Sequence, residues 1–278
     1  MEIGSKMSGH QDVRAPVSQP VRVVQITDCH LGAQAGDLLL GLDTDESLDD
    51  VLDTLVANEP SAALLLATGD ISNKGATASY TRFLDLVWNK LSLPVGWLAG
   101  NHDQAQAMEA IERPNLSYRH VDVANWRIIL LDSSVLGEVH GEIRPAEMQR
   151  LQTLLSETDK HTLVFVHHQP VPVGSEWMDQ YIIRNSEALL SELERRPNVK
   201  GLIWGHVHQE FSGSHGDLAL YATPSTCIQF KPNEDEFALD DVMPGYRWFD
   251  LHDDGHFETG VVRIPRKEYP IEFGSGGY

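Results

Sequence analysis

Five short polar clusters, each directly after an apolar run, hold the side chains of this chain that could do chemistry. They are Asp28-Cys29-His30, Gly69-Asp70, Gly100-Asn101-His102-Asp103, His167-His168 and Gly205-His206-Val207-His208. Carboxylates, imidazoles and amide oxygens without thiolates favour borderline or hard divalent cations such as manganese, iron, zinc or cobalt. The clusters therefore predict a metal centre.

The spacing inside the clusters suits shared ligation. Asp28 and His30 are two residues apart on a segment expected to be extended, so their side chains point the same way and can share one cation. His206 and His208 have the same spacing. Cys29 should point away from the metal. Glycines come before ligands in three of the clusters, where a residue without Cβ lets the chain turn sharply and approach a cation closely.

His167 and His168 are adjacent, so on a strand they point to opposite sides and only one of them can face the same centre. Position alone does not say which. The number of ligand-type residues indicates two cations about 3.5–4 Å apart, bridged by one carboxylate, as in metal-dependent phosphoester cleavage. Two divalent cations and the carboxylates of Asp28 and Asp70 leave an excess charge of about +2, which one hydroxide and one phosphodiester would balance.

Each cluster taken alone also fits an ordinary role. Gly69-Asp70 is a common turn, Asn101 or Asp103 could cap a helix, and His206 with His208 could be a buried histidine pair. All five clusters in this order, each at the end of an apolar run, favour the metal centre.

The elements that would position these clusters alternate between strands and helices. Strands are expected at 21–27, 62–68, 94–99, 126–132, 161–167 and 201–205, and helices at 76–90 and from Thr44, Pro145 and Ser186. This alternation predicts an α/β fold with a parallel or mixed sheet, and ligands of such sheets bind beyond the carboxyl ends of the strands. Later strands at 218–223, 246–252 and 257–264 are expected to be antiparallel, and 174–183 and 233–245 to be loops near the site.

Composition limits the class of partner. The 278 residues carry a formal net charge of −20, which opposes nonspecific binding to nucleic acid or to an anionic membrane. No apolar run approaches the roughly 18 residues of a membrane span. Residues 1–20 lack the pattern of a secretory signal and are expected to be a disordered tail or residues added for expression, followed by a single catalytic domain over 21–278. Two cysteines give no disulfide framework, which fits a reducing cytoplasm.

The ordered set Asp-x-His, Gly-Asp, Gly-Asn-His-Asp, His and Gly-His-x-His resembles the calcineurin-like metallophosphoesterase superfamily over residues 28–208. Within it, the segments 40–44, 139–142, 177–180, 184–185 and 222–232 are similar to the bacterial class III 3′,5′-cyclic AMP phosphodiesterases. The resemblance covers nearly everything after residue 20. It implies a four-layer α-β-β-α sandwich, with two mixed sheets flanked by helices.

The resemblance also implies a ligand set. One cation would be held by Asp28, His30, Asp70 and His208, and the other by Asp70, Asn101, His167 and His206. Asp70 would be the bridge. Iron and manganese are the common metals of the family, with zinc or cobalt as further options, and a homodimer can form. The substrate would contact His30, Asp70, Asn101, His102, His167 and His208. Cys29 stands where threonine or serine is more usual, with little effect expected.

The function implied is hydrolysis of 3′,5′-cyclic AMP to 5′-AMP in the cytoplasm, through in-line attack of a hydroxide on phosphorus. His102 would stabilise the developing charge or protonate the departing 3′ oxygen, positioned by Asp103, while Asp70 would be essential to both cations. Two alternatives stay open. The same site could act on 2′,3′-cyclic nucleotides, glycerophosphodiesters or phosphomonoesters, and the fold could be a non-catalytic scaffold. Candidate residues for stacking on a base are Trp177, Tyr181 and Phe230.

Overall fold

The computed structural model describes residues 19–117 and 119–277, so the predicted tail lies outside the described residues except for 19 and 20. The helices are α1 (Thr44–Asn58), α2 (Thr77–Lys90), α3 (Ala105–Glu109), α4 (Pro145–Ser156), α5 (Glu176–Asp179) and α6 (Ser186–Glu194). The first strands are β1 (Val21–Ile26), β2 (Leu38–Leu39), β3 (Leu42–Asp43), β4 (Ala62–Thr68), β5 (Val95–Leu98), β6 (Leu116–Ser117), β7 (His120–Val123) and β8 (Trp126–Leu130). The later strands are β9 (His161–Phe165), β10 (Val199–Trp204), β11 (Phe211–His215), β12 (Leu218–Ala222), β13 (Gln229–Phe230), β14 (Leu239–Asp240), β15 (Gly245–Leu251) and β16 (Phe257–Arg263).

Most of these strands form two six-stranded mixed sheets. Within the described ranges the first sheet has the order β16-β15-β1-β4-β5-β6 and the second the order β11-β12-β10-β9-β8-β7. Strands β1, β4, β5 and β6 run parallel, as do β8, β9, β10 and β12, while β15, β16, β11 and β7 are antiparallel to their neighbours. The strands that end in the polar clusters are thus among the parallel strands of the two sheets.

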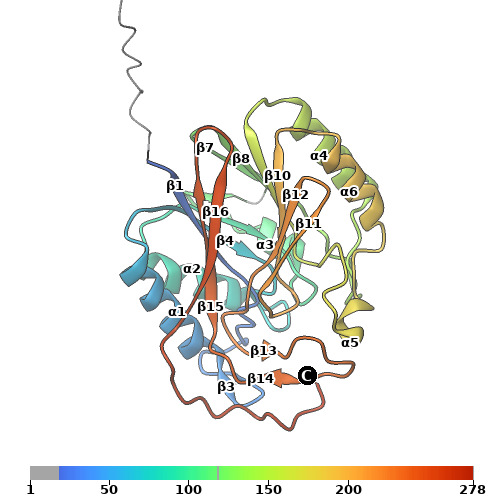
Figure 1. The fold of residues 1–278 in the computed structure, drawn as a ribbon. Coiled ribbons are helices and arrows are strands. Elements are labelled where there is room, and N and C mark those ends of the chain that lie inside the picture. Colours follow the sequence, from blue (N-terminus) through green and yellow to red (C-terminus); the bar gives the residue numbers. More distant parts are fainter. Residues whose placement is uncertain (1–18, 118, 278) are drawn as a thin grey trace, which may run out of the picture.

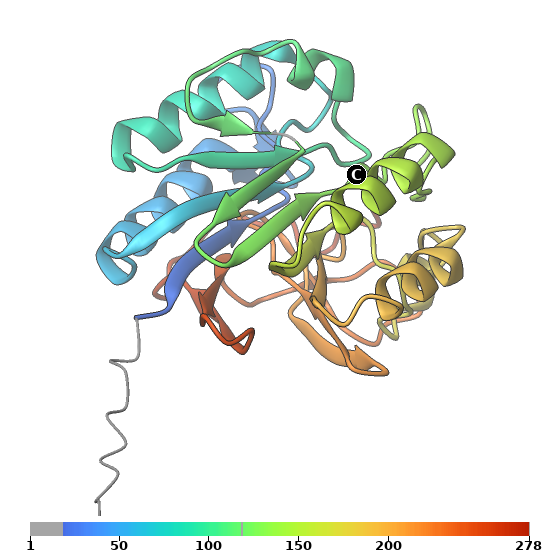
Figure 2. The same ribbon diagram turned by 90° about the horizontal axis from the view of Figure 1, so that it is seen from above.

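The two sheets pack face to face, with helices on both outer faces (Figures 1 and 2). Helices α1 and α2 cover the first sheet, and α4 and α6 cover the second. Three buried apolar clusters correspond to the three gaps between layers, one between the sheets and one under each helical layer. The predicted α-β-β-α sandwich is confirmed.

Alternation along the strands explains why the strand sequences are almost wholly apolar. In β4, Leu64 and Leu66 point into the core between the sheets, whereas Leu65 points toward α1 and α2. Leu163 and Val164 divide in the same way between the inter-sheet core and the layer under α4 and α6. Because both faces of each sheet are covered, both faces of each strand must be apolar.

The helix starts agree with the sequence to within one residue. Helix α1 begins at Thr44, and its cap is Asp43, whose carboxylate accepts from the amides of Asp45 and Glu46. Helix α4 begins at Pro145. Helix α6 begins at Ser186 itself, with Asn185 as the cap residue. None of the helices in the described ranges is long and apolar enough to cross a membrane.

One strand was expected in the wrong orientation, and several short elements were not expected. Strand β12 pairs parallel with β10, because β11 runs back along the sheet edge before β12 enters. Strands β15 and β16 are antiparallel, as expected. The two-residue strands of β2–β3 and β13–β14, and the single turn α5, are too short to show a periodic pattern in sequence.

Candidate metal centre

The structure brings together every residue that the sequence proposed for the site. Asp28 and His30 follow β1, Asp70 follows β4, Asn101 and His102 follow β5, His167 follows β9, and His206 and His208 follow β10. Strands β1, β4 and β5 run parallel to one another in the first sheet, as do β9 and β10 in the second, so their carboxyl ends meet at one edge of the sandwich. Side chains far apart in sequence therefore share one location.

The backbone at these positions differs from the extended geometry that the sequence suggested. Asp28, His30, Asp70, His206 and His208 have φ of 54°, 48°, 49°, 62° and 47°, in the left-handed region. Such conformations cost on the order of 1–3 kcal/mol each in a residue with a side chain and occur where a site requires them. The side chains converge because the chain turns sharply at each strand end, and strand alternation is not the cause.

The first group of donors consists of one carboxylate oxygen and two imidazole nitrogens, from Asp28, His30 and His208. The distance from His208 Nε2 to Asp28 Oδ1 is 3.3 Å, and that from His208 Nε2 to His30 Nε2 is 3.2 Å. Asp28, His30 and His208 are all buried, and their ligand atoms lie within 4.8 Å of one another. One cation would be reached by all three.

The second group of donors meets the first at Asp70. His167 Nε2 lies 3.2 Å from Asp70 Oδ2 and 3.2 Å from Asn101 Oδ1. The same Oδ2 atom of Asp70 is 3.7 Å from His30 Nε2. One carboxylate oxygen thus lies between the two groups, which is the position a bridging ligand needs.

Backbone carbonyls fix the orientation of the ligand-type histidines. His167 Nδ1 donates to the carbonyl of Thr68 (2.9 Å), and His208 Nδ1 donates to that of Ile228 (2.8 Å). With the proton held on Nδ1, Nε2 presents its lone pair to the centre. These partners could not be found from sequence, because every residue has a carbonyl.

His102 lies beside the centre, and its surroundings correct one expectation. Its amide donates to Asp70 Oδ1 (2.8 Å), its ring meets that of His30 edge to face, and its Nδ1 donates to the carbonyl of Asn73 (2.9 Å). Asp103 was expected to position His102. Its carboxylate instead accepts from the amides of Ile71, Ser72 and Gly100. Asp103 holds the two loops together, and Asn73 holds the ring.

Two glycines allow the loops to approach this closely. A Cβ on Gly100 would lie 2.2 Å from Asp70 Oδ1, and a Cβ on Gly205 would lie 2.1 Å from Thr27 Oγ1. No side chain fits at either position without moving a carboxylate or the residue that holds it. The glycines predicted to precede ligands are therefore required by contact.

Electrostatics favours the binding of cations. Burial acts to raise the pKa of both Asp28 and Asp70, but nearby histidines outweigh it, chiefly His208 for Asp28 and His167 for Asp70, so both pKa values are lowered and both groups are carboxylates. Burial lowers the pKa of His30 to about 3, leaving a neutral ring. Asp70 raises the pKa of His167 to about 9 against the effect of burial, so this ring gives up a proton when a cation binds, and the ionised carboxylates and imidazole nitrogens then form a donor set that fits two divalent cations.

The metal-free protein should lose stability as the pH falls below about 6.5. Burial lowers the pKa of His30 to about 3 and those of His168 and His206 well below 6.5. Below pH 6.5, and above the lowered pKa of each folded histidine, the unfolded chain binds protons that the folded chain does not. The free energy of unfolding therefore falls by about 1 kcal/mol for each pH unit of acidification and for each such histidine. His167 acts oppositely at higher pH, because Asp70 raises its pKa to about 9 against the effect of burial, and its contribution is lost as the pH rises from 6.5 toward 9.

Thermal unfolding of chelator-treated protein between pH 7 and pH 5 would check this. Asp28 and Asp70 do not contribute in that window, since their lowered pKa values place their effect below about pH 4, whereas Asp103, whose pKa burial raises to about 7, offsets about one of the three histidines. A melting temperature that is constant from pH 7 to pH 5 would contradict the expected charge states.

A cavity of about 350 Å³ opens beside the centre. Asp70, Asn101, His102 and His206 line one end, and the aromatic residues Trp177, Tyr181, Phe230 and Phe237 line another. Trp177 and Phe237 lie in the segments 174–183 and 233–245. Cys29 is buried in the apolar cluster under α1 and α2, away from this cavity as expected.

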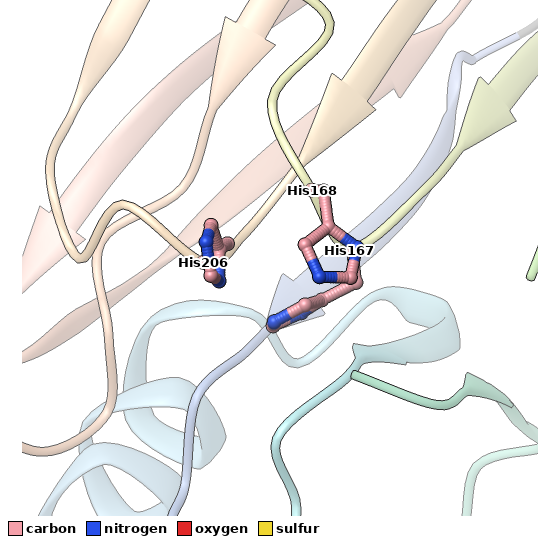
Figure 3. A group of neighbouring side chains, drawn as sticks. All are labelled: His167, His168 and His206. Carbon is pink, nitrogen blue, oxygen red and sulfur yellow. The ribbon is translucent and has the colours of Figure 1, made fainter. Parts of the chain in front are cut away.

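The structure distinguishes the adjacent histidines. His167 Nε2 faces Asp70 and Asn101, whereas His168 Nδ1 lies 2.8 Å from Ser133 Oγ. The two rings were expected on opposite sides, yet the His168 ring stays beside the cluster, with its centroid 4.7 Å from that of His206 (Figure 3). Strand β9 ends at Phe165, so strand alternation no longer applies two residues later.

Comparison with known proteins places this arrangement among relatives. Residues 21–210 match the family model described as calcineurin-like phosphoesterase. A protein of Pseudomonas aeruginosa named 3′,5′-cyclic adenosine monophosphate phosphodiesterase CpdA is 43% identical over 274 residues, covering 98% of this chain and 100% of that protein. A Vibrio vulnificus protein of the same name is 40% identical over 262 residues, covering 93% and 95%.

A solved structure supports the fold independently of sequence. The structure described as a dimetal phosphatase from Danio rerio superposes with a TM-score of 0.57 at 16% identity, covering 89% of this chain and 100% of that one. At this identity the likeness speaks for the fold alone. The family match over most of the sandwich and the relatives matched over nearly the full length agree with the geometry: this chain belongs to the calcineurin-like phosphoesterase family.

Proposed function

We propose that this protein hydrolyses 3′,5′-cyclic AMP to 5′-AMP at a dinuclear metal centre. The observation that carries the proposal is the position of Asp70, whose Oδ2 lies between two groups of donors at the end of an aromatic-lined cavity. Two relatives matched over more than nine-tenths of the chain are named as cyclic AMP phosphodiesterases. The donor groups supply the chemistry, and the cavity supplies room for a nucleoside.

The ligands of each cation are part of this proposal. Asp28, His30, Asp70 and His208 would hold one, and Asp70, Asn101, His167 and His206 would hold the other. Bound there, the pair would supply an activated water and positive charge for the phosphoryl oxygens. Nitrogen and oxygen donors without thiolate suit iron and manganese, which we propose as the native pair.

His102 has the surroundings of a general acid. Its Nδ1–H is held by the Asn73 carbonyl, so Nε2 is the ring nitrogen that would meet the substrate. The backbone contact to Asn73 persists whether the ring is neutral or doubly protonated, so the ring can give a proton from Nε2 without losing its position. The hydrogen bond from its backbone amide to Asp70 fixes the distance between this acid and the metal centre. His102 would protonate the departing 3′ oxygen or stabilise its charge.

The aromatic wall is suited to a purine. Phe230 stacks on His208, with ring centroids 4.1 Å apart and planes 7° apart, and therefore acts as a support for that ligand. Trp177 packs edge to face against Phe230 and Phe237 and is only partly buried. Trp177 and Tyr181 are thus the residues with surface to offer a base.

Trp177→Ala should raise KM for cyclic AMP about 5- to 100-fold, because stacking of a base on an aromatic ring is worth about 1–3 kcal/mol. Turnover of bis(p-nitrophenyl) phosphate, which has no base, should change little. Steady-state kinetics with both substrates checks this. Trp248→Ala, at an aromatic residue on β15 outside the cavity, is the control. Equal losses on both substrates would remove Trp177 from base recognition.

A turnover panel tests the proposed function. The manganese-loaded protein should act on 3′,5′-cyclic AMP at least tenfold better in kcat/KM than on 2′,3′-cyclic AMP, glycerophosphodiesters or 5′-AMP. A preference for one of the others would make the protein a different phosphoesterase with the same centre. Metal binding without turnover of any of them would indicate a scaffold.

The thiol state fits the proposed cytoplasmic setting. Cys29 and Cys227 are both buried free thiols, and burial raises the pKa of the Cys227 thiol to about 12. Thiols of this kind are protonated and unreactive. The proposed partner is a small cyclic nucleotide, and the charge of −20 opposes binding to nucleic acid.

A further inference from the structure

His168 is a fully buried histidine that the ligand assignment leaves without a role. Its exposed fraction is 0%, and its ring forms a triangle with those of His167 and His206, at centroid distances of 4.9 Å and 4.7 Å (Figure 3). One ring nitrogen from each of the three histidines lies within 4.8 Å of the others. A leucine or phenylalanine would fill the space without burying polar nitrogens, so packing alone does not account for an imidazole here.

Ser133 anchors the His168 ring at one nitrogen. Ser133 Oγ is 2.8 Å from His168 Nδ1 and also accepts from the amides of His167 and His168, each at 3.3 Å. Ser133 lies just beyond the end of β8, and its amide-binding hydroxyl joins that end to the end of β9. The serine therefore holds both the backbone that carries His167 and the ring of His168.

The rest of the ring is enclosed. A Cβ on Gly141 would lie 2.7 Å from His168 Cβ and Cγ, so the loop before α4 closes one side. His206 closes another, and neither His168 Nε2 nor His206 Nε2 has a hydrogen-bond partner among the described residues. Enclosed in this way, the His168 ring can adopt one orientation, in which one side of the ring packs against His206.

His168 is poorly placed to be a ligand itself. Among the described residues, one group of donors with carboxylates contains His167 and none contains His168; His206 meets the centre through its ring, whose centroid is 5.0 Å from that of His167. A divalent cation gains most from the carboxylates, which His167 Nε2 faces at 3.2 Å through Asp70. His206, by contrast, has its amide held by Asp28 at 3.0 Å, while its ring has no hydrogen-bonding partner at Nε2 that would fix its rotation.

We propose that His168, anchored by Ser133, is a positioning residue that holds the ring of His206 in the orientation needed to bind the second cation. This rests on the proposed ligand role of His206. The pair Ser133–His168 acts for His206 as the carbonyls of Thr68 and Ile228 act for His167 and His208.

Cobalt(II) titration of chelated protein tests this without substrate. The wild type should bind two equivalents. His168→Leu should bind one equivalent normally and the second about 10- to 100-fold more weakly, the usual effect of removing a residue that orients a ligand. His168→Gln, which can still bond Ser133, should recover most of the affinity. His120→Leu, at a half-buried histidine on β7, is the control and should bind as the wild type does.

The Ser133 variants separate positioning from general damage. Ser133→Ala should weaken the same second site, and in combination with His168→Leu it should add less than its own single loss, because part of its effect passes through the His168 ring and the rest through the backbone of His167. If His168→Leu does not fold, as judged by its thermal transition, Ser133→Ala and His168→Gln still test the proposal.

Two results would overturn this inference, and a third would overturn the proposed function on which it rests. Unchanged affinity at both sites in a folded His168→Leu protein would remove any positioning role. Loss of a nitrogen donor from the visible cobalt spectrum at saturation would make His168 a ligand. A wild type that binds no second cation would instead end the dinuclear assignment, which distinguishes failure of the proposed function from failure of this inference.

Discussion

Asp70→Asn is expected to lower kcat for cyclic AMP about a thousandfold or more and to abolish tight binding of the second cation. The Oδ2 atom of Asp70 lies 3.2 Å from His167 Nε2 and 3.7 Å from His30 Nε2, so both donor groups depend on its charge. The charge that a bound cation supplies to a phosphoryl transition state is worth several kcal/mol, and each 1.4 kcal/mol or so is a factor of ten in rate. Activity assays with metal analysis of the purified variant check both parts.

Asp103→Asn is the matched control for this prediction. Asp103 is also buried, and burial together with the charge of Asp70 raises its pKa to about 7. It binds the amides of Ile71, Ser72 and Gly100 and no donor group of the centre. An asparagine oxygen in the place of Oδ2 keeps the bonds from Ile71 and Gly100 and loses only the one from Ser72, so both cations should still bind. Two full equivalents of metal in Asp70→Asn would contradict the bridging assignment.

The covering of a sheet on both faces could be predicted because its cause is local in sequence, whereas the pair of sheets was expected only from the family resemblance. The run Leu64-Leu65-Leu66 has no polar face, and a strand of that kind must be covered on both sides. Because the strands were expected to run parallel, the polar clusters at their ends were expected to meet at one edge of the sheet. The orientation of β12 could not be predicted, since it depends on where the β11–β12 hairpin docks and not on either strand's own pattern.

The side-chain directions at the centre had a different cause from the predicted one. Strand alternation was expected to align Asp28 with His30, but both residues have positive φ and lie in turns. Sequence does not show such strain, because only a minority of aspartate and histidine residues adopt positive φ, although they do so more often than most residue types. The same limit applies to His168, whose direction was inferred from alternation beyond the end of β9.

Backbone partners were the other contribution that sequence could not show. The carbonyls of Thr68, Asn73 and Ile228 hold three histidine rings of the site. Any residue at these positions would supply the same oxygen, so only the fold determines which carbonyl faces which ring. Residue types thus predict which donors are present, and the strand ends determine their orientation.

His102→Ala is expected to lower kcat for cyclic AMP about 10²- to 10⁴-fold while both cations still bind, because a general acid contributes about that factor. His102 donates a hydrogen bond from its backbone amide to Asp70 Oδ1, at 2.8 Å. Alanine keeps that amide, so the position of the bridging carboxylate should survive the loss of the ring. Metal analysis of the variant should therefore match the wild type.

The leaving group decides whether the ring acts as an acid. A departing 3′ alkoxide needs a proton, whereas p-nitrophenolate does not, so His102→Ala should lose less than about tenfold on bis(p-nitrophenyl) phosphate if protonation is its role. Equal losses on both substrates would instead assign the ring to charge stabilisation on the phosphoryl group. His215→Ala, at an exposed histidine on β11, should leave both rates unchanged. Unchanged turnover of cyclic AMP in His102→Ala would exclude both roles, because in each of them the Nε2 of His102 must touch the reacting phosphate or its leaving oxygen.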